Sequence, residues 1–167
     1  MSLLIDDLLK LSRLSRADIR MANVDLSQLA STIAAALHES APQRIVEFVI
    51  EPQLTARADP GLARIVLENL LDNAWKYTSK NPTAKIEFGG IMEADKSVFF
   101  VRDDGAGFDV GHAGKLFGTF QRMHHQRDFP GSGIGLATVQ RIVRRHGGKV
   151  WADASVGKGA SFFFTFG

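Results

Sequence analysis

Three polar side chains near the middle of the sequence have the spacing of one helix face. Asn69, Asn73 and Lys76 stand at positions i, i+4 and i+7. Asn is a weak helix former because its amide competes for backbone groups, so helix stability does not explain two of them one turn apart. Carboxamide oxygens suit a hard cation such as Mg²⁺, and an ammonium suits a phosphate. The stripe is therefore either a site for a metal and a phosphate or an ordinary solvated face.

A second candidate is the run Asp103-Asp104-Gly105-Ala106-Gly107, which directly follows a predicted strand. Its glycines would let the backbone close on a flat ligand, while a carboxylate accepts a hydrogen bond, for example from the amino group of adenine. The alternative is a plain surface turn, since Asp-Gly pairs are common in turns. An EF-hand calcium loop is excluded, because its twelfth position requires a Glu and holds Gly114.

A third candidate is the run GSGIGL at residues 131–136. Alternate glycines before a helix leave backbone N–H groups bare at its N-terminus, which favours phosphate. The run is not a dinucleotide fingerprint, which needs a small residue at Leu136 and a strand just before. It is not a P-loop either, because no Gly-Lys-Ser/Thr follows. A simple loop is the alternative.

The elements that must position these residues follow from hydrophobic periodicity. The stripe lies in a predicted helix over 62–78, beside an apolar arc that packs into a core. The other predicted elements are helices over 3–21, 26–39 and 136–146, and strands over 45–50, 54–58, 85–92, 97–102, 149–154 and 161–166. This order is not a strict βαβ alternation. It predicts an α+β fold, a two-layer α/β sandwich whose mixed, mostly antiparallel sheet is covered on one face by three helices.

Two segments stand apart from this layout. The helix over 3–21 has an apolar face that needs a partner, either a second helix of a bundle arm or the domain itself. Residues 109–130 carry glycines and basic residues without a long regular element, which is typical of a functional or mobile segment. Trp151, on a predicted strand, is expected in the core, and so is the strand over 161–166.

Composition limits the class of protein. The 167 residues are 45% hydrophobic and 23% charged, which fits one globular domain with an appended element. Without cysteine there is no disulfide framework and no thiolate zinc site. A net charge of +2 does not suggest a nucleic-acid binder. No apolar run is long enough to span a membrane and no signal peptide is visible, so we expect a cytoplasmic domain without membrane contact.

Four segments, in order, resemble the ATP-binding catalytic domain of bacterial sensor histidine kinases, the Bergerat ATP-binding fold shared with gyrase and mismatch-repair ATPases. NLLDNAWKYT is similar to the N box, DDGAGF to the G1 box, LFGTFQRM to the F box and GSGIGL to the G2 box. The resemblance covers about residues 25–166, and its last part most resembles phytochrome-like and PAS-linked kinases. Residues 1–22 resemble the end of the dimerisation hairpin, which leaves 23–167 as the catalytic domain.

The resemblance implies a role for each matching position. Asn73 would be the Mg²⁺ ligand, Asn69 would support the metal and phosphates, and Lys76 would reach the phosphates. Asp103 would accept the adenine amino group. The other implied ATP contacts are Tyr77, Gly105, Gly107, Arg122, Gly131, Ser132, Gly133, Ile134, Gly135 and Leu136, with Ser161 in a water network beside Asp103. ATP and Mg²⁺ are the implied cofactors.

The residue at position 69 carries a mechanistic expectation. Related ATPases that hydrolyse ATP have a Glu one turn before the metal Asn, whereas this chain has Asn69, and an amide cannot act as a general base at neutral pH. Glu68 lies about 100° around the helix and faces away. The site should therefore position Mg-ATP and leave activation of the nucleophile to the acceptor.

The acceptor implied by the resemblance is a histidine on the helix hairpin of the protein's own dimer, with a response regulator downstream. No histidine precedes His38, and none of the five resembles a phosphoacceptor box. We therefore predict that this chain binds ATP but does not phosphorylate itself. Two alternatives stay open: a non-catalytic ATP-binding regulatory module, and a serine kinase of the anti-sigma type.

Overall fold

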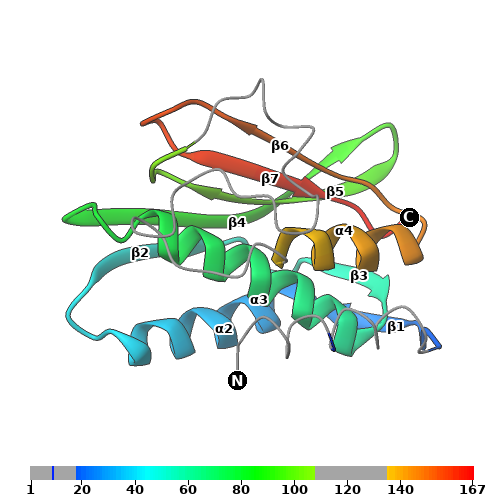
Figure 1. The fold of residues 1–167 in the computed structure, drawn as a ribbon. Helices are drawn as coiled ribbons and strands as arrows, with labels where there is room; N and C mark the ends of the chain where they lie inside the picture. The colour runs from blue at the N-terminus through cyan, green and yellow to red at the C-terminus, as the bar shows by residue number, and fades with distance from the viewer. Residues whose placement is uncertain (1–8, 10–17, 108–134) are drawn as a thin grey trace.

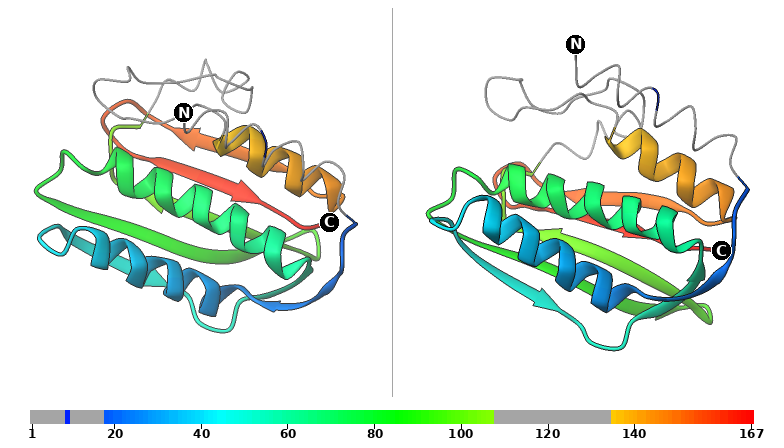
Figure 2. Two further views of the ribbon diagram at one scale, coloured as in Figure 1. Left: turned by 60° about the horizontal axis from the view of Figure 1, so that its bottom comes forward. Right: turned by 90° about the horizontal axis from the view of Figure 1, so that it is seen from below.

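The computed structural model describes Leu9, residues 18–107 and residues 135–167. Within these ranges, three helices lie side by side on one face of a five-stranded sheet, as Figures 1 and 2 show. The helices are α2 (Leu26–Ser40), α3 (Pro60–Tyr77) and α4 (Gly135–Arg145). This arrangement confirms the predicted α+β sandwich with helices on a single face.

The sheet has the strand order β2-β4-β5-β7-β6. Its first pair, β2 with β4, is parallel, and the remaining pairs are antiparallel. The mixed, mostly antiparallel sheet is thus as predicted. The bounds are β2 (Ile45–Ile50), β4 (Thr83–Glu93), β5 (Lys96–Asp103), β6 (Val150–Ala154) and β7 (Ala160–Phe164).

Helix α3 forms the centre of the core. Asp59 caps its N-terminus by accepting a hydrogen bond from the Leu62 N–H, and Pro60 occupies the first turn, where no N–H is needed. One side of the helix is fully buried between the sheet and the two flanking helices. The predicted apolar arc supplies that side: Val66, Leu67, Leu70, Leu71 and Ala74.

Some local predictions need correction. No strand was predicted between the helices over 3–21 and 26–39, but β1 (Ala22–Asp25) pairs antiparallel with β3 (Thr55–Ala58) in a separate two-stranded sheet. Residues 18–21 have no regular secondary structure, so the helix predicted over 3–21 does not extend over these residues. Most of that helix lies outside the described residues.

Trp151 is not a core residue. It lies on the edge strand β6 with 37% of its surface exposed, and it stacks on Phe163 across the sheet face opposite the helices. Strand β7 alternates between buried and half-buried residues, so it presents one face to the helices and the other outward. The run of phenylalanines concealed this alternation, because the sequence is apolar on both faces.

Candidate functional site

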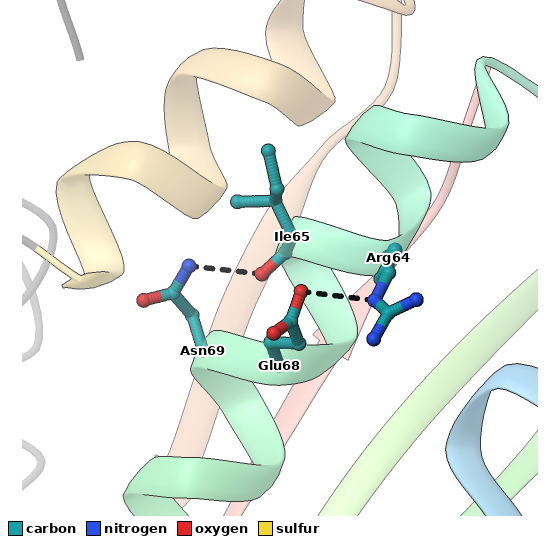
Figure 3. Close-up of polar contacts among 4 residues, drawn as sticks. All are labelled: Arg64, Ile65, Glu68 and Asn69. Atoms are coloured by element: carbon teal, nitrogen blue, oxygen red, sulfur yellow. Dashed lines mark hydrogen bonds and ion pairs between the residues drawn. The ribbon is translucent and has the colours of Figure 1, made fainter. Parts of the chain in front are cut away.

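The polar stripe lies on α3 as predicted, and its first residue is held in one orientation. The Asn69 side-chain Nδ2 donates to the carbonyl oxygen of Ile65, 2.8 Å away, which leaves Oδ1 as the outward acceptor (Figure 3). That oxygen lies close to the start of α4: a Cβ atom added to Gly135 would be only 3.0 Å from the Asn69 Oδ1. The glycine therefore lets α4 approach the Asn69 amide closely.

Glu68 takes no part in the stripe. Its carboxylate pairs with Arg64 at 3.4 Å on the exposed side of α3, as Figure 3 shows. This geometry confirms that the neighbouring carboxylate faces away from Asn69. Among the described residues, no carboxylate occupies the position one turn before Asn73.

Asn73 and Lys76 occupy the next two turns and are both half-buried. Within the described part of the chain, the Asn73 side chain makes no hydrogen bond or ion pair, so its amide oxygen can bind a ligand. The ammonium of Lys76 lies 3.6 Å from the carboxylate of Asp72, which is exposed, and such a solvated pair contributes little to stability. A ligand phosphate could replace Asp72 at the ammonium at small cost.

Asp103 is the last residue of β5, and its side chain is 94% buried on the helix-facing side of the sheet. Its carboxylate Oδ1 accepts a hydrogen bond from the Gly105 N–H at 2.8 Å. Burial raises the pKa of Asp103 to about 6; the Gly105 N–H opposes this rise and the charge of Asp104 adds to it. Such a buried carboxylate at a strand end is suited to accept a hydrogen bond from a bound ligand.

The loop after Asp103 lies against the C-terminus of α3. The Ala106 N–H donates to the Tyr77 carbonyl at 3.0 Å, and a Cβ on Gly105 would overlap that same carbonyl oxygen. This contact joins two of the predicted motifs through their backbones. It also explains why residue 105 must be a glycine.

The turn between β6 and β7 supports the same loop, a contact that the sequence did not predict. The Gly157 N–H donates to the Ala106 carbonyl at 2.6 Å, and a Cβ on Gly159 would overlap the Asp103 carbonyl. Gly107 packs in turn against the Ser155 carbonyl. The two glycines of this turn, Gly157 and Gly159, indicate that another part of the backbone comes close. The sequence does not show which part, because their contact partners lie about fifty residues earlier.

Replacing Gly107 with Ala should destabilise the domain by about 3 kcal/mol or more. Gly107 has φ +65°, and an added Cβ would collide with the Ser155 backbone. Gly157→Ala is the matched control, since Gly157 has φ +77° with nothing within 4 Å of its Cβ position, so only the backbone strain of about 1 kcal/mol remains. Denaturant unfolding measures the free energy of unfolding of both variants. An equal loss of stability in Gly107→Ala and Gly157→Ala would contradict the crowding at Gly107.

Ser161 does not lie beside Asp103. In the register of β5 and β7, Ala160 is opposite Asp103, whereas Ser161 is opposite Arg102. The Arg102 Nε accordingly donates to Ser161 Oγ at 3.0 Å. Because successive side chains of a strand point to opposite faces, Ser161 belongs to the outer face of the sheet, and the expectation of a water network beside Asp103 is corrected.

Helix α4 brings the third motif to the same side of α3. Gly135 begins the helix next to Asn69, and Leu136 packs against the core. The remaining predicted contacts lie outside the described residues: Arg122, Gly131, Ser132, Gly133 and Ile134. The described structure therefore unites the asparagine stripe, the Asp103 loop and the first turn of α4 around α3.

Comparison with known proteins identifies the class. Residues 58–167 match the family model described as histidine kinase-, DNA gyrase B- and HSP90-like ATPase. The matched range spans most of the chain and contains the whole candidate site. This chain belongs to that family of ATPase domains.

Two curated relatives and one solved structure are similar over nearly the whole chain. The methanogenesis regulatory histidine kinase FilI of Methanothrix harundinacea is 35% identical, covering 97% of this chain and 18% of FilI. Cyanobacterial phytochrome B of Nostoc sp. is 36% identical, covering 97% of this chain and 22% of the phytochrome. The crystal structure of full-length ShkA in complex with AMPPNP superposes with a TM-score of 0.79 and 28% identity, covering 96% of this chain and 34% of ShkA. The chain thus spans about a fifth of the two curated relatives.

Proposed function

We propose that this chain is the Mg-ATP-binding catalytic domain of a sensor histidine kinase. It transfers the γ-phosphoryl group of ATP to a histidine on the dimerisation hairpin of its own dimer. The observation that carries the proposal is the meeting of three motifs around α3: the Asn69–Lys76 stripe, the Asp103 loop and the start of α4. The family match and the similarity to named histidine kinases support the same activity.

The site residues divide between the two ends of the nucleotide. Asp103 accepts the adenine amino group, and Gly105 and Gly107 hold the loop beside it by packing against the Tyr77 and Ser155 carbonyls. Lys76, in the last turn of α3, binds the phosphates. The backbone N–H groups of the first turn of α4 have no partner within the helix and face the phosphates as well.

The residues present fit a magnesium ion. Mg²⁺ is held in phosphoryl-transfer sites by one or two protein oxygens together with substrate phosphates and waters. Asn73 offers a half-exposed amide oxygen without an internal partner among the described residues, and Asn69 Oδ1 lies one turn away on the same face. The ion, held by Asn73, would neutralise charge on the phosphates.

The same residues explain why the site transfers phosphate rather than hydrolysing ATP. Asn69 is fixed by the Ile65 carbonyl and carries no proton-accepting group near neutral pH, while Glu68 is turned toward Arg64. Positions 68 and 69 therefore supply no base that could activate water near the γ-phosphate. An imidazole brings its own nucleophilic nitrogen and needs only correct placement.

The isolated chain should not label itself with phosphate. His38 packs edge-on against Phe48 and Trp75. Both ring nitrogens of His146 are engaged, with Nε2 accepting from the Asp59 N–H and Nδ1 beside the Ile142 carbonyl. We expect no acid-labile phosphate on this chain after incubation with radiolabelled Mg-ATP; stable incorporation would contradict the need for a separate hairpin.

The experiment that tests the function supplies that hairpin. A purified dimeric helix hairpin of the parent protein, carrying its acceptor histidine, is mixed with this chain and labelled Mg-ATP. Acid-labile, base-stable phosphate on the hairpin histidine is the expected result. Phosphate on serine would instead indicate an anti-sigma-type kinase, and ATP binding without transfer would indicate a regulatory module.

The wider assignments belong to this proposal. The domain acts in the cytoplasm, where ATP is available, and a response regulator receives the phosphate from the hairpin. No helix among the described residues has the length and apolar character needed to cross a membrane. In this proposal residues 1–22 belong to the end of the dimerisation hairpin and residues 23–167 to the catalytic domain.

A further inference from the structure

Arg44 lies outside the predicted site but holds the end of α3. It directly precedes β2, and its guanidinium Nη1 donates to the Trp75 carbonyl at 2.7 Å. The Nη2 atom donates to the Thr78 hydroxyl at 3.0 Å. The guanidinium carbon also lies over the Trp75 ring, 4.2 Å from its centroid. One side chain therefore fixes the backbone, a hydroxyl and an aromatic ring at the same helix end.

The surroundings make this contact rigid. Thr78 is fully buried, and its hydroxyl also bonds back to the Ala74 carbonyl at 2.7 Å. Trp75 is 9% exposed and stacks in parallel on Phe48, with centroids 6.1 Å apart. A cation at this position also interacts favourably with the negative end of the helix dipole. The last turn of α3 thus has one well-defined position.

That last turn supports the Asp103 loop. Tyr77, between the two residues that Arg44 binds, accepts the Ala106 N–H at 3.0 Å through its carbonyl. Gly105 packs onto the same carbonyl and donates its N–H to the Asp103 carboxylate at 2.8 Å. Any shift of the helix end must therefore move the loop that orients Asp103.

We propose that Arg44 is a positioning residue for adenine recognition. By holding residues 75–78, it keeps the Tyr77 carbonyl and the loop after it in the place that aligns Asp103 with the base. Arg44 contacts neither the base nor the reacting atoms. The inference rests on the proposed function, in which Asp103 accepts the adenine amino group.

The most informative variant is Arg44→Lys. Lysine keeps the charge, but its single nitrogen cannot bond the Trp75 carbonyl and the Thr78 hydroxyl in the forked geometry of a guanidinium. Arg64→Lys is the matched control, because it makes the same change on the exposed side of α3, where Arg64 pairs only with Glu68 among the described contacts. Titration calorimetry with ATP and with GTP, both with Mg²⁺, gives the affinities.

GTP separates positioning from a general loss of stability. Guanine presents a carbonyl where adenine presents its amino group, so a well-placed Asp103 carboxylate favours ATP. We expect Arg44→Lys to weaken ATP binding roughly five- to tenfold and GTP binding much less, so the ATP preference falls. Arg64→Lys should change either affinity by less than about twofold.

The outcomes are decisive in each direction. An Arg44→Lys protein with a lower melting temperature but an unchanged ATP-to-GTP ratio would show a purely structural role and overturn the proposal. If Arg44→Lys does not fold, the ratio of ATP to GTP affinity is measured for Thr78→Val. This variant removes the hydroxyl that accepts from Arg44 Nη2 and keeps the hydrogen bond from Nη1 to the Trp75 carbonyl. A wild-type chain that binds neither nucleotide would overturn the proposed function and this inference with it.

Discussion

Replacing Asp103 with Asn is expected to weaken ATP binding by about 10- to 100-fold without unfolding the domain. In Asn, one carboxylate oxygen is replaced by an NH₂ group, which cannot accept from the adenine amino group, and the remaining oxygen is uncharged. The charged hydrogen bond to adenine is therefore lost. The Asn oxygen can still accept the Gly105 N–H, which preserves the loop. Titration calorimetry with Mg-ATP measures the loss.

The same variant should be more stable than the wild type near neutral pH. Burial raises the pKa of Asp103 from 3.8 to about 6, so between these values the folded state retains a proton that the unfolded state has released. The free energy of unfolding of the wild type therefore falls as pH rises through this window and is constant above it. The full difference corresponds to about 3 kcal/mol, an upper value because the buried amide also needs partners.

Denaturant unfolding of both proteins at several pH values tests this sign. The stability gain of Asp103→Asn should be largest above pH about 6 and vanish below pH about 4. Asp104→Asn is the comparison: it removes a charge that raises the pKa of Asp103 but leaves that carboxyl in place, so the fall of stability with rising pH should persist. A variant that lost stability and kept its ATP affinity would refute the assignment of Asp103 to adenine.

Replacing Asn73 with Ala should reduce phosphotransfer at least about 100-fold and remove the dependence of ATP binding on Mg²⁺. The substitution is structurally mild, because Asn73 makes no hydrogen bond among the described residues and Ala is the better helix former by about 0.6 kcal/mol. A loss of activity can thus be separated from a loss of fold. ATP affinity is measured with and without Mg²⁺, and thermal unfolding is measured in parallel.

Glu68→Ala is the control for Asn73→Ala on the same helix. It removes an exposed side chain that pairs with Arg64 on the side of α3 away from the stripe. We expect normal Mg²⁺ dependence and normal transfer from this control. If Asn73→Ala still bound ATP more tightly with Mg²⁺ than without it, Asn73 would not be the metal ligand.

Patterns with a local cause were predicted well from the sequence. The apolar arc and polar stripe of α3, the Asp-Gly run after a strand and the alternate glycines before a helix are patterns of residues a few positions apart in the sequence. The family resemblance ordered these motifs into one site, and the structure brings its described members together. The correction at Ala22 arises from its pairing with a distant strand, and the correction at Trp151 arises from the position of β6 at the edge of the sheet; no short window encodes either.

Two features of the site depend on geometry that only the structure supplies. A one-residue difference in register turns Ser161 toward Arg102 and away from Asp103. Arg44 is separated from Trp75 by 31 residues, and nothing in its local sequence marks it as a contact of the helix end. Both features require the positions of segments relative to one another.

The most direct test of the central claim follows the γ-phosphate of labelled Mg-ATP in a single reaction. This chain is mixed with the dimeric hairpin of its parent, and phosphate on histidine and phosphate released to water are measured together. The account predicts that most of the transferred phosphate appears as acid-labile phosphohistidine on the hairpin, and that release to water is slow when the hairpin is omitted. Release to water at the same rate with or without the hairpin, and none on histidine, would contradict it.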